Sequence, residues 1–380
     1  MSAQRVADRT ISAGGAPALD RALEQLAARA SELDAEPRFP AEDFVSLLAA
    51  GVPQLAADRS RCDLGVEVTL IRSVAAADAS VARILDGHYN GVERLALLAD
   101  DAQLRASELA RIAAGELLLG VWGADPAPGE GEPARIERAA ERGGMTLHGV
   151  KTFCSGAGGV QRALVIARDD SDQRRIAYVD VTRGTTLDRD WYRASGLRAS
   201  ESHRVLFDDA PVLALLGGAD EIMREPWFAR DAVRTSATWA GIADLILDST
   251  VRTLAGRPAD ELRLHALGRM RLAQSSIDRW LDSTVTVLQR AASESAGEAH
   301  EATSERLSGW AALSAECRLA IADAARTIAG EAARVCGSRA LVGGGALDRA
   351  RRDLDLFLLQ HRLDPKLVEI GTRTLAEGSP

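Results

Sequence analysis

Apolar residues recur at helical spacing at the start of the chain. Leu19, Leu23, Leu26 and Ala30 share one stripe, which predicts a helix over residues 18–33. A second helix is expected after Phe39, with Pro40 tolerated in its first turn and Gly51 as its stop. The same spacing predicts further helices over residues 66–77, 80–85 and 101–114.

The pattern changes near residue 116, where the apolar runs become short and are bounded by glycine, proline and charged residues. Runs of this kind are typical of buried strands in a small β unit. They are Leu117–Trp122, Arg162–Ala167, Arg175–Val181 and His203–Phe207. The last of them precedes Asp208–Pro211.

The helical period returns from about residue 217. Three long, alanine-rich amphipathic stretches follow, at residues 227–254, 259–292 and 304–336, and they suit an antiparallel bundle. The sequence therefore predicts an α+β protein in three parts. We expect an N-terminal α-helical domain (1–116), a middle small β-barrel or sandwich domain (117–215) and a C-terminal four-helix bundle (216–380).

Composition narrows the classes of partner. The chain has 380 residues, 46% of them hydrophobic, which is ample for sizeable cores. A net charge of -9, with arginines interleaved among acidic residues, argues against nucleic acid. No apolar run approaches the ~20 residues that cross a bilayer, and the start lacks a signal-peptide layout. The four cysteines show no metal or disulfide spacing, so we expect no metal site and a cytoplasmic protein.

The segment Leu147–Ala157 carries the most chemistry. It is expected to be a strand that ends in a small-residue turn, with the aromatic ring of Phe153 and the hydroxyl of Ser155 beside exposed backbone at Gly156. A flat heterocycle such as a flavin would fit there. Taken alone, Ser155–Gly159 is better explained as a plain loop between two strands, because glycine is the usual residue of tight turns.

The order of these segments resembles the acyl-CoA dehydrogenase superfamily over almost the whole chain. Four stretches carry the resemblance: Gly149–Gly156, Gly196–Asp208, Arg230–Gly241 and Cys336–Asp353. The first is similar to the family's Gly-x-Lys-x-aromatic-x-Ser/Thr segment. The resemblance implies that Phe153 stacks beside the isoalloxazine and that the Ser155 hydroxyl bonds near flavin N5.

Further cofactor contacts are implied by the same resemblance. Gly156 and Trp122 belong to segments that the family places at the flavin, and Arg352 lies in an Arg-Asp helix that approaches the dinucleotide of a neighbouring subunit. The expected cofactor is FAD, with FMN as the alternative. The resemblance also implies a homodimer or homotetramer.

Two departures from the family bear on its chemistry. Typical dehydrogenases follow the first strand with Thr-Glu-Pro-Gly-x-Gly-Ser, whereas this chain has Trp122–Gly129. The catalytic glutamate of the family's Tyr-Glu-Gly-Thr motif is absent, and His361 stands at about its place. Some relatives take the base from the first C-terminal helix, where this chain has Asp231.

Either residue has an alternative interpretation. Neutral imidazole is available near pH 7, so His361 can act as a base that removes a proton beside a carbonyl. It can equally be a hydrogen-bonded histidine at a helix end. Asp231 can be the base or an ordinary acidic residue at a helix N-terminus.

A second branch of the superfamily, the reduced-flavin monooxygenases, is similar at Gln360–Lys366 and at Lys151–Ala157. There a histidine and a serine assist oxygen activation, roles that His361 and Ser155 would fill. His88 and Tyr89 are candidates for the wall of the substrate pocket, or they form a buried, hydrogen-bonded pair.

Of three possible functions we predict the first, and the other two stay as alternatives. The first is an FAD-dependent oxidoreductase of acyl-CoA dehydrogenase type that acts on an acyl thioester by proton abstraction and hydride transfer to flavin N5. The second is a two-component monooxygenase that uses reduced FMN or FAD, oxygen and a small-molecule substrate. The third is a flavin-binding or scaffold protein that has lost turnover. The sequence does not identify the electron acceptor or a flavin reductase.

Overall fold

The computed structural model describes residues 15–138, 143–258, 260–297, 304–360 and 362–377. The chain forms two compact units. The first holds the described residues up to Leu70, Ser80–Ala194 and Arg198–Arg224. The second holds Ile71–Ala79, Ser195–Leu197 and the described residues from Glu225 onward.

Helices open the first unit. They are α2 (Gly15–Ala35), α3 (Ala41–Ala49), the first turns of α4 (Leu64–Ala77), α5 (Ala79–Leu98) and α6 (Ala102–Ala113). The apolar stripe predicted for α2 is buried: Leu26 and Ala30 are fully inaccessible. Asp101 caps α6, since its carboxylate accepts hydrogen bonds from the backbone N–H groups of Gln103 and Leu104.

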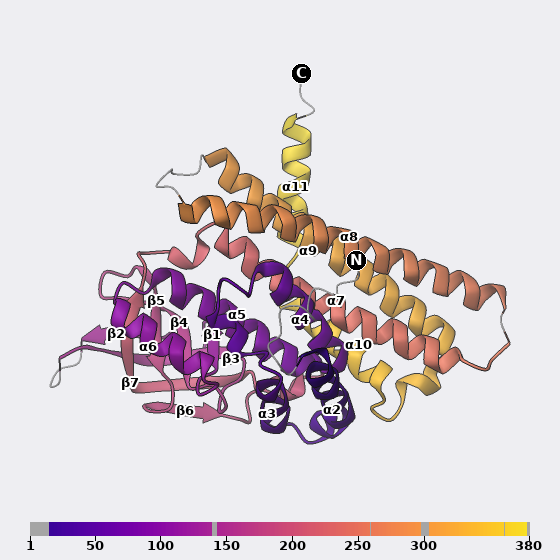
Figure 1. Cartoon of the computed structure of the whole chain (residues 1–380), viewed down its shortest axis with the longest axis horizontal. Coiled ribbons are helices and arrows are strands. Elements are labelled where there is room, and N and C mark those ends of the chain that lie inside the picture. Colours follow the sequence, from indigo (N-terminus) through magenta and orange to yellow (C-terminus); the bar gives the residue numbers. More distant parts are fainter. Residues whose placement is uncertain (1–14, 139–142, 259, 298–303, 361, 378–380) are drawn as a thin grey trace. The chain divides into compact units, whose positions relative to one another are not determined.

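A small β barrel completes the first unit (Figure 1). Its strands are β1 (Leu119–Trp122), β2 (Arg135–Arg138), β3 (Met145–Cys154), β4 (Arg162–Arg168), β5 (Arg174–Asp180), β6 (Thr185–Asp188) and β7 (His203–Leu216). Their order is β1-β4-β2-β3-β7-β5, and β5 also pairs with β4. This last pairing closes the sheet into a barrel, while β6 adds to β7.

Irregularities in β3 bend it along the barrel. Its register against β7 shifts between Leu147 and Gly149 and again between Lys151 and Cys154. Gly149 has φ 102°, and a Cβ there would lie 2.7 Å from the carbonyl oxygen of Pro133. Only glycine fits such a close approach, which lets the strand turn toward its functional end.

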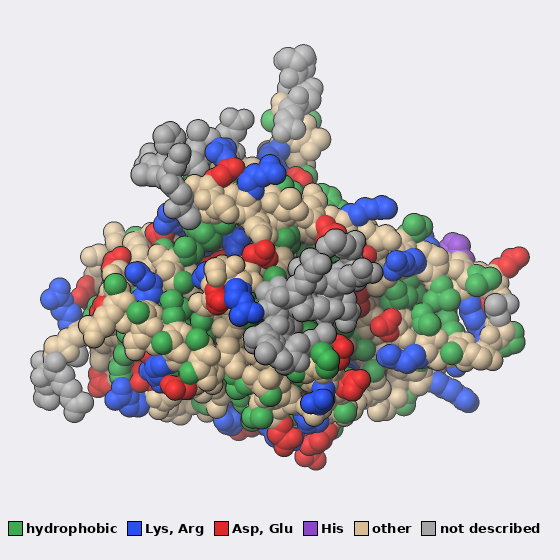
Figure 2. All heavy atoms as spheres, viewed as in Figure 1, with side chains coloured by type: hydrophobic (Ala, Val, Ile, Leu, Met, Phe, Trp, Pro, Cys, Tyr) green, Lys and Arg blue, Asp and Glu red, His purple; other side chains and the backbone are tan. Residues whose placement is uncertain are grey.

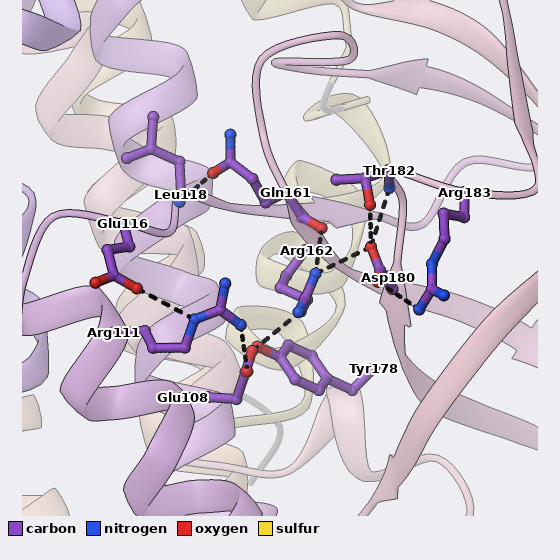
Figure 3. A network of polar contacts seen from close by, with 10 residues as sticks. All are labelled: Glu108, Arg111, Glu116, Leu118, Gln161, Arg162, Tyr178, Asp180, Thr182 and Arg183. Carbon is purple, nitrogen blue, oxygen red and sulfur yellow. Dashed lines mark hydrogen bonds and ion pairs between the residues drawn. The ribbon is translucent and has the colours of Figure 1, made fainter.

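A buried polar network holds α6 to the barrel (Figure 3). The carboxylate of Glu108 accepts a 3.0 Å hydrogen bond from Arg162 Nε and a 2.5 Å hydrogen bond from the Tyr178 hydroxyl. Arg162 also pairs with Asp180 at 3.0 Å, and Arg111 reaches Glu108 at 3.0 Å. Each buried charge has opposite charges and donors around it, and these contacts offset the desolvation penalty of burying the network.

The second unit is a helical bundle. Its helices are α7 (Trp227–Leu254), α8 (Glu261–Gly297), α9 (Ser304–Cys336), α10 (Ala346–Leu359) and α11 (Asp364–Glu377). α7 packs against α8, α9 and α10, and α8 packs against α9, so these four form the bundle (Figure 1). The last turns of α4 also join it: Arg72 makes two hydrogen bonds to Asp244, at 2.6 and 3.0 Å.

The predicted arrangement of helices, then strands, then helices is observed, with corrections at several boundaries. Strand β7 does not end at Phe207 but continues to Leu216, and Asp209 adopts φ 55° within it. The short strands β2 and β6 were not predicted, because neither carries an apolar run. Helix α5 is longer than predicted. The division into domains at residues 116 and 215 stays a prediction.

Candidate functional site

The turn after β3 presents an aromatic ring to the surface. Phe153 has φ 52°, a left-handed conformation that is unfavourable for a bulky side chain, and it is 43% exposed. Its ring meets Trp191 edge-on at 4.9 Å between centroids and Tyr192 at 6.5 Å. The backbone kink that exposes Phe153 is therefore supported by two aromatic neighbours.

Three serine hydroxyls form a hydrogen-bonded row that begins at the same turn. Ser155 Oγ lies 2.8 Å from Ser202 Oγ, which lies 2.8 Å from Ser200 Oγ, and Ser200 is 3.5 Å from the Tyr192 hydroxyl. Either oxygen of each serine pair can donate. All three serines are buried. Each hydroxyl can rotate, so the direction of these hydrogen bonds can reverse while the oxygen atoms stay in place.

Trp122 and Gly156 fix the position of the turn. Trp122 is buried and its indole N–H donates to the Ser155 carbonyl at 3.0 Å. The N–H of Gly156 donates to the Ser200 carbonyl at 2.8 Å. Gly156 has φ 77°, and a Cβ there would lie 2.9 Å from Val160 and 3.2 Å from Ile84. Both predicted cofactor residues thus adjoin Ser155, and both act on the shape of the turn.

The segment after β1 is tied to the same end of β3. Lys151 is buried, and its ammonium donates to Asp125 at 2.6 Å. Thr152 donates from its N–H to the Ala124 carbonyl at 3.0 Å and from its hydroxyl to the Asp125 carbonyl at 3.1 Å. These contacts hold the stretch that departs from the family pattern against the turn.

Cys154 follows Phe153 at the end of β3. It is fully buried, and burial raises the pKa of its thiol well above the ordinary value. A thiol that stays protonated is a poor nucleophile. Cys154 is therefore a packing residue of the turn.

A cavity of about 410 Å³, which the sequence did not predict, lies beside the aromatic ring of Tyr192. Its lining residues are Pro37, Arg189, Tyr192, Arg193, Ala194, Arg198, Glu201 and His203. Glu201 is buried and has φ 47°. Its carboxylate accepts a 2.6 Å hydrogen bond from Arg189 Nη1, and His203 Nε2 lies 3.0 Å from it. The arginines and His203 look ordinary in the sequence, and only the fold gathers them.

His88 and Tyr89 are both fully buried on α5. His88 Nε2 lies 3.0 Å from the Pro53 carbonyl and Nδ1 accepts from the Leu119 N–H at 3.1 Å, which defines a neutral tautomer. Burial lowers the pKa of His88 to about 4. The Tyr89 hydroxyl donates to the Val52 carbonyl at 2.9 Å. Both side chains thus join α5 to neighbouring backbone, and we do not carry them into the proposed site.

Asp231 and Arg352 belong to the second unit. Asp231 on α7 accepts a 3.2 Å contact from Arg234, which is buried. Arg352 on α10 donates to Asp348 at 3.0 Å and to the Ser195 carbonyl at 2.6 Å. His361 lies outside the described residues. A catalytic role for His361 or Asp231, and a cofactor contact for Arg352, stay predictions.

Two stretches that carry the family resemblance do meet in the second unit. Asp353 accepts a 2.6 Å hydrogen bond from the Leu197 N–H. A Cβ at Gly196 would lie 2.3 Å from the Arg352 carbonyl oxygen, so only glycine allows this close approach. Gly196 and Leu197 are thus fastened to the Arg-Asp helix α10, although they are far apart from it in sequence.

Surface charge, membrane-spanning helices and possible metal ligands each concern a kind of binding partner. On the face that Figure 2 shows, basic and acidic side chains are interspersed. Within the described ranges, no helix is long and apolar enough to cross a bilayer. Among the same residues, no group of three or more His, Cys, Asp or Glu side chains could hold a metal ion.

No protein-family model matches the chain, and no curated protein matches its sequence. Its structure is similar to that of TdsC from Paenibacillus sp. A11-2 in complex with FMN and indole, with TM-score 0.84 and 17% identity over 96% of this chain and 97% of that chain. It is also similar to KijD3 in complex with FMN and dTDP-3-amino-2,3,6-trideoxy-4-keto-3-methyl-D-glucose, with TM-score 0.84 and 21% identity over 99% and 94%.

A third similar structure is methanesulfinate monooxygenase MsuC from Pseudomonas fluorescens, with TM-score 0.83 and 21% identity over 96% of this chain and 97% of that chain. Coverage this complete shows that the chain has the fold of these enzymes, with helical ends and a small barrel between them. The predicted fold class is confirmed at this level. Identities this low carry no further conclusion about the reaction.

Proposed function

We propose that the chain is a flavin-dependent monooxygenase that uses reduced FMN and oxygen on a small-molecule substrate. The observation that carries the proposal is the turn at Phe153–Gly156, in a fold shared over nearly the whole chain with FMN-bound TdsC and KijD3. TdsC is a dibenzothiophene monooxygenase and MsuC a methanesulfinate monooxygenase. These likenesses favour the second of the three functions, and FMN over FAD.

The residues of the turn fit a flat ring system. The exposed ring of Phe153 offers an edge or face to a heterocycle, and aromatic pairs prefer offset or edge-on contact. A Cβ at Gly156 would lie 2.9 Å from Val160, so the glycine keeps the backbone of the turn compact. We propose that Phe153 and the backbone around Ser155 hold the isoalloxazine, and that Trp122 keeps the Ser155 carbonyl in place.

When bound, a reduced flavin supplies two electrons to oxygen, chemistry that no protein side chain provides. The protein's part is to orient, to exclude water and to handle protons. We propose that the hydroxyls of Ser155, Ser202 and Ser200 hold or pass a proton at the turn, because they are buried and 2.8 Å apart. We also keep the proposal that His361 assists as an acid or base.

Desaturation of an acyl thioester has less support. It needs a base beside the substrate α-carbon, and the family's glutamate motif is absent from the sequence. The alternative base, Asp231, makes an ion pair with buried Arg234, which favours a structural role for its carboxylate. A monooxygenase does not require that carboxylate.

Binding of FMN tests the cofactor. Wild-type protein should bind FMN more tightly than FAD in a fluorescence titration. Phe153→Gly should weaken FMN binding about tenfold through the lost ring contact, yet leave thermal stability equal or higher, because glycine accepts φ 52° without strain. Val45→Ala, which trims an exposed apolar side chain of the same unit, is the control. Failure of wild-type protein to bind any flavin would overturn the proposal.

Turnover tests the reaction. The protein is given chemically reduced FMN, oxygen and a panel of indoles, thioethers and sulfinates, and products are followed by mass spectrometry for incorporation of ¹⁸O from labelled oxygen. We expect label in the product of at least one substrate class. Bleaching of bound, oxidised flavin by an acyl-CoA without oxygen would instead establish the dehydrogenase.

A further inference from the structure

The cavity beside Tyr192 carries an excess of positive charge. Arg189, Arg193 and Arg198 line it, whereas Glu201 is the one carboxylate among its lining residues. Arg189 already pairs with Glu201 at 2.6 Å. The other two guanidiniums therefore set the charge that a ligand would meet.

The guanidinium groups of Arg193 and Arg198 are available to bind a ligand. Arg193 pairs with Asp190 at 2.7 Å, but the two side chains are 77% and 89% exposed, so water competes strongly for this contact. Arg198 is half-buried, and its side chain makes no ion pair or hydrogen bond within the part of the chain that the structure describes. A half-buried guanidinium of this kind is a ready donor for an anion.

His203 adds a buried donor or acceptor to the same cavity. The residue is 4% exposed, and neither ring nitrogen has a hydrogen-bond partner among the described residues. Its Nε2 lies 3.0 Å from Glu201, close enough for an ion pair but not aligned for a hydrogen bond. An imidazole buried without a hydrogen bond is costly, and a ligand in the cavity would remove that cost.

We propose that this cavity binds a small organic molecule through a phosphate group. Phosphate suits a site where guanidinium groups supply several donors and the positive charge exceeds the negative. The ring of Tyr192, with Pro37 and Ala194, gives the rest of the ligand an apolar wall. A volume of about 410 Å³ is that of an ordinary small-molecule site.

The inference rests on the first unit alone and does not require the proposed monooxygenase function. The phosphate can belong to the substrate or to FMN itself, since Tyr192 also contacts Phe153 at 6.5 Å between ring centroids. The chemistry is the same in both cases. Comparison of ligands with and without the phosphate separates the two sources.

Calorimetric titration with phenyl phosphate, and with phenol as the uncharged counterpart, tests the site directly. We expect wild-type protein to bind phenyl phosphate and not phenol. Arg198→Gln should weaken phenyl phosphate about tenfold or more. Arg138→Gln, which removes an exposed arginine of the same unit outside this cavity, should leave the affinity unchanged. His203→Asn should also weaken the affinity for phenyl phosphate. If this buried variant fails to fold, Arg198→Gln still tests the site.

Titration with FMN and riboflavin assigns the phosphate. If Arg198→Gln weakens FMN but not riboflavin, the cavity holds the phosphate of the cofactor. If it weakens phenyl phosphate but neither flavin, the cavity holds a phosphorylated substrate. Absence of phenyl phosphate binding to wild-type protein, or equal losses in Arg198→Gln and Arg138→Gln, would overturn the inference. Phosphate binding in a protein that binds no flavin would refute the proposed function and leave this site standing.

Discussion

Acid should destabilise the first unit through His88. The imidazole is fully buried, hydrogen-bonded as a neutral ring to Pro53 and Leu119, and its pKa is lowered to about 4. In the unfolded chain the pKa returns to about 6.5, so the unfolded state binds a proton first. The stability that this histidine contributes is therefore complete above about pH 6.5 and is lost as the pH falls toward 4.

The size of the effect follows from the shift. A difference of this size between folded and unfolded pKa is worth about 3 kcal/mol at most, and about 2 kcal/mol of it is lost between about pH 7.5 and about pH 5. Carboxylates also titrate in acid, so the wild-type curve alone does not isolate His88. A variant that keeps both hydrogen bonds but cannot titrate does so.

His88→Gln is that variant, since the glutamine amide can donate to the Pro53 carbonyl and accept from the Leu119 N–H. Urea unfolding at a series of pH values should show wild-type protein losing about 2 kcal/mol more than the variant between about pH 7.5 and about pH 5. Tyr89→Phe removes a neighbouring hydrogen bond without touching the titration, and it should keep the pH dependence of the wild type. Parallel curves for wild-type protein and His88→Gln would refute the argument. FMN affinity at neutral pH should be the same in both.

Four further outcomes are expected. Glu108→Ala should cost about 3 kcal/mol in urea unfolding, because it removes the acceptor of the Tyr178 hydroxyl and leaves buried Arg162 with one carboxylate partner, Asp180. Tyr178→Phe, which removes one donor of the same network, should cost about 1 kcal/mol. Gly241→Ala should destabilise the bundle by about 2 kcal/mol, since its Cβ would lie 2.2 Å from a backbone carbonyl of α4. Gly268→Ala, where a Cβ meets nothing, should stabilise α8 by up to about 1 kcal/mol. If the predicted homo-oligomer uses α11, Val368→Asp, at a 70% exposed position, should lower the mass measured by light scattering, and an unchanged mass would exclude this face.

The long helices could be predicted because their apolar period is strong. Residues 227–254 and 304–336 form α7 and α9 within the predicted bounds, since each buries one continuous stripe. Strands β2 and β6 could not, because each has four mostly polar residues and owes its place to neighbours in the barrel. Pairing across a closed sheet is a long-range property that local pattern does not encode.

The candidate site also has parts that could be predicted from the sequence and parts that could not. Phe153, Ser155, Gly156 and Trp122 were predicted, since they lie on one motif or on the strand beside it, and the structure brings them together. The cavity could not be predicted, because Glu201 and His203 matter there through their burial and geometry. Nor could the sequence show that the Ser155 hydroxyl meets Ser202, 47 residues further along the chain.

Backbone strain links the turn to the cavity. Five described non-glycine residues of the first unit have positive φ, and three of them are aspartates, which tolerate this conformation. The other two are Phe153 and Glu201, each held at a cost of about 1 to 3 kcal/mol. Phe153 exposes its ring beside Tyr192, and Glu201 lies in the wall of the cavity that Tyr192 also lines. A glycine or asparagine at either position would relieve this strain, yet the chain keeps a bulky residue at both. Because one strained residue lies in the turn and the other lines the cavity, the strain favours one functional site that includes the turn and the cavity.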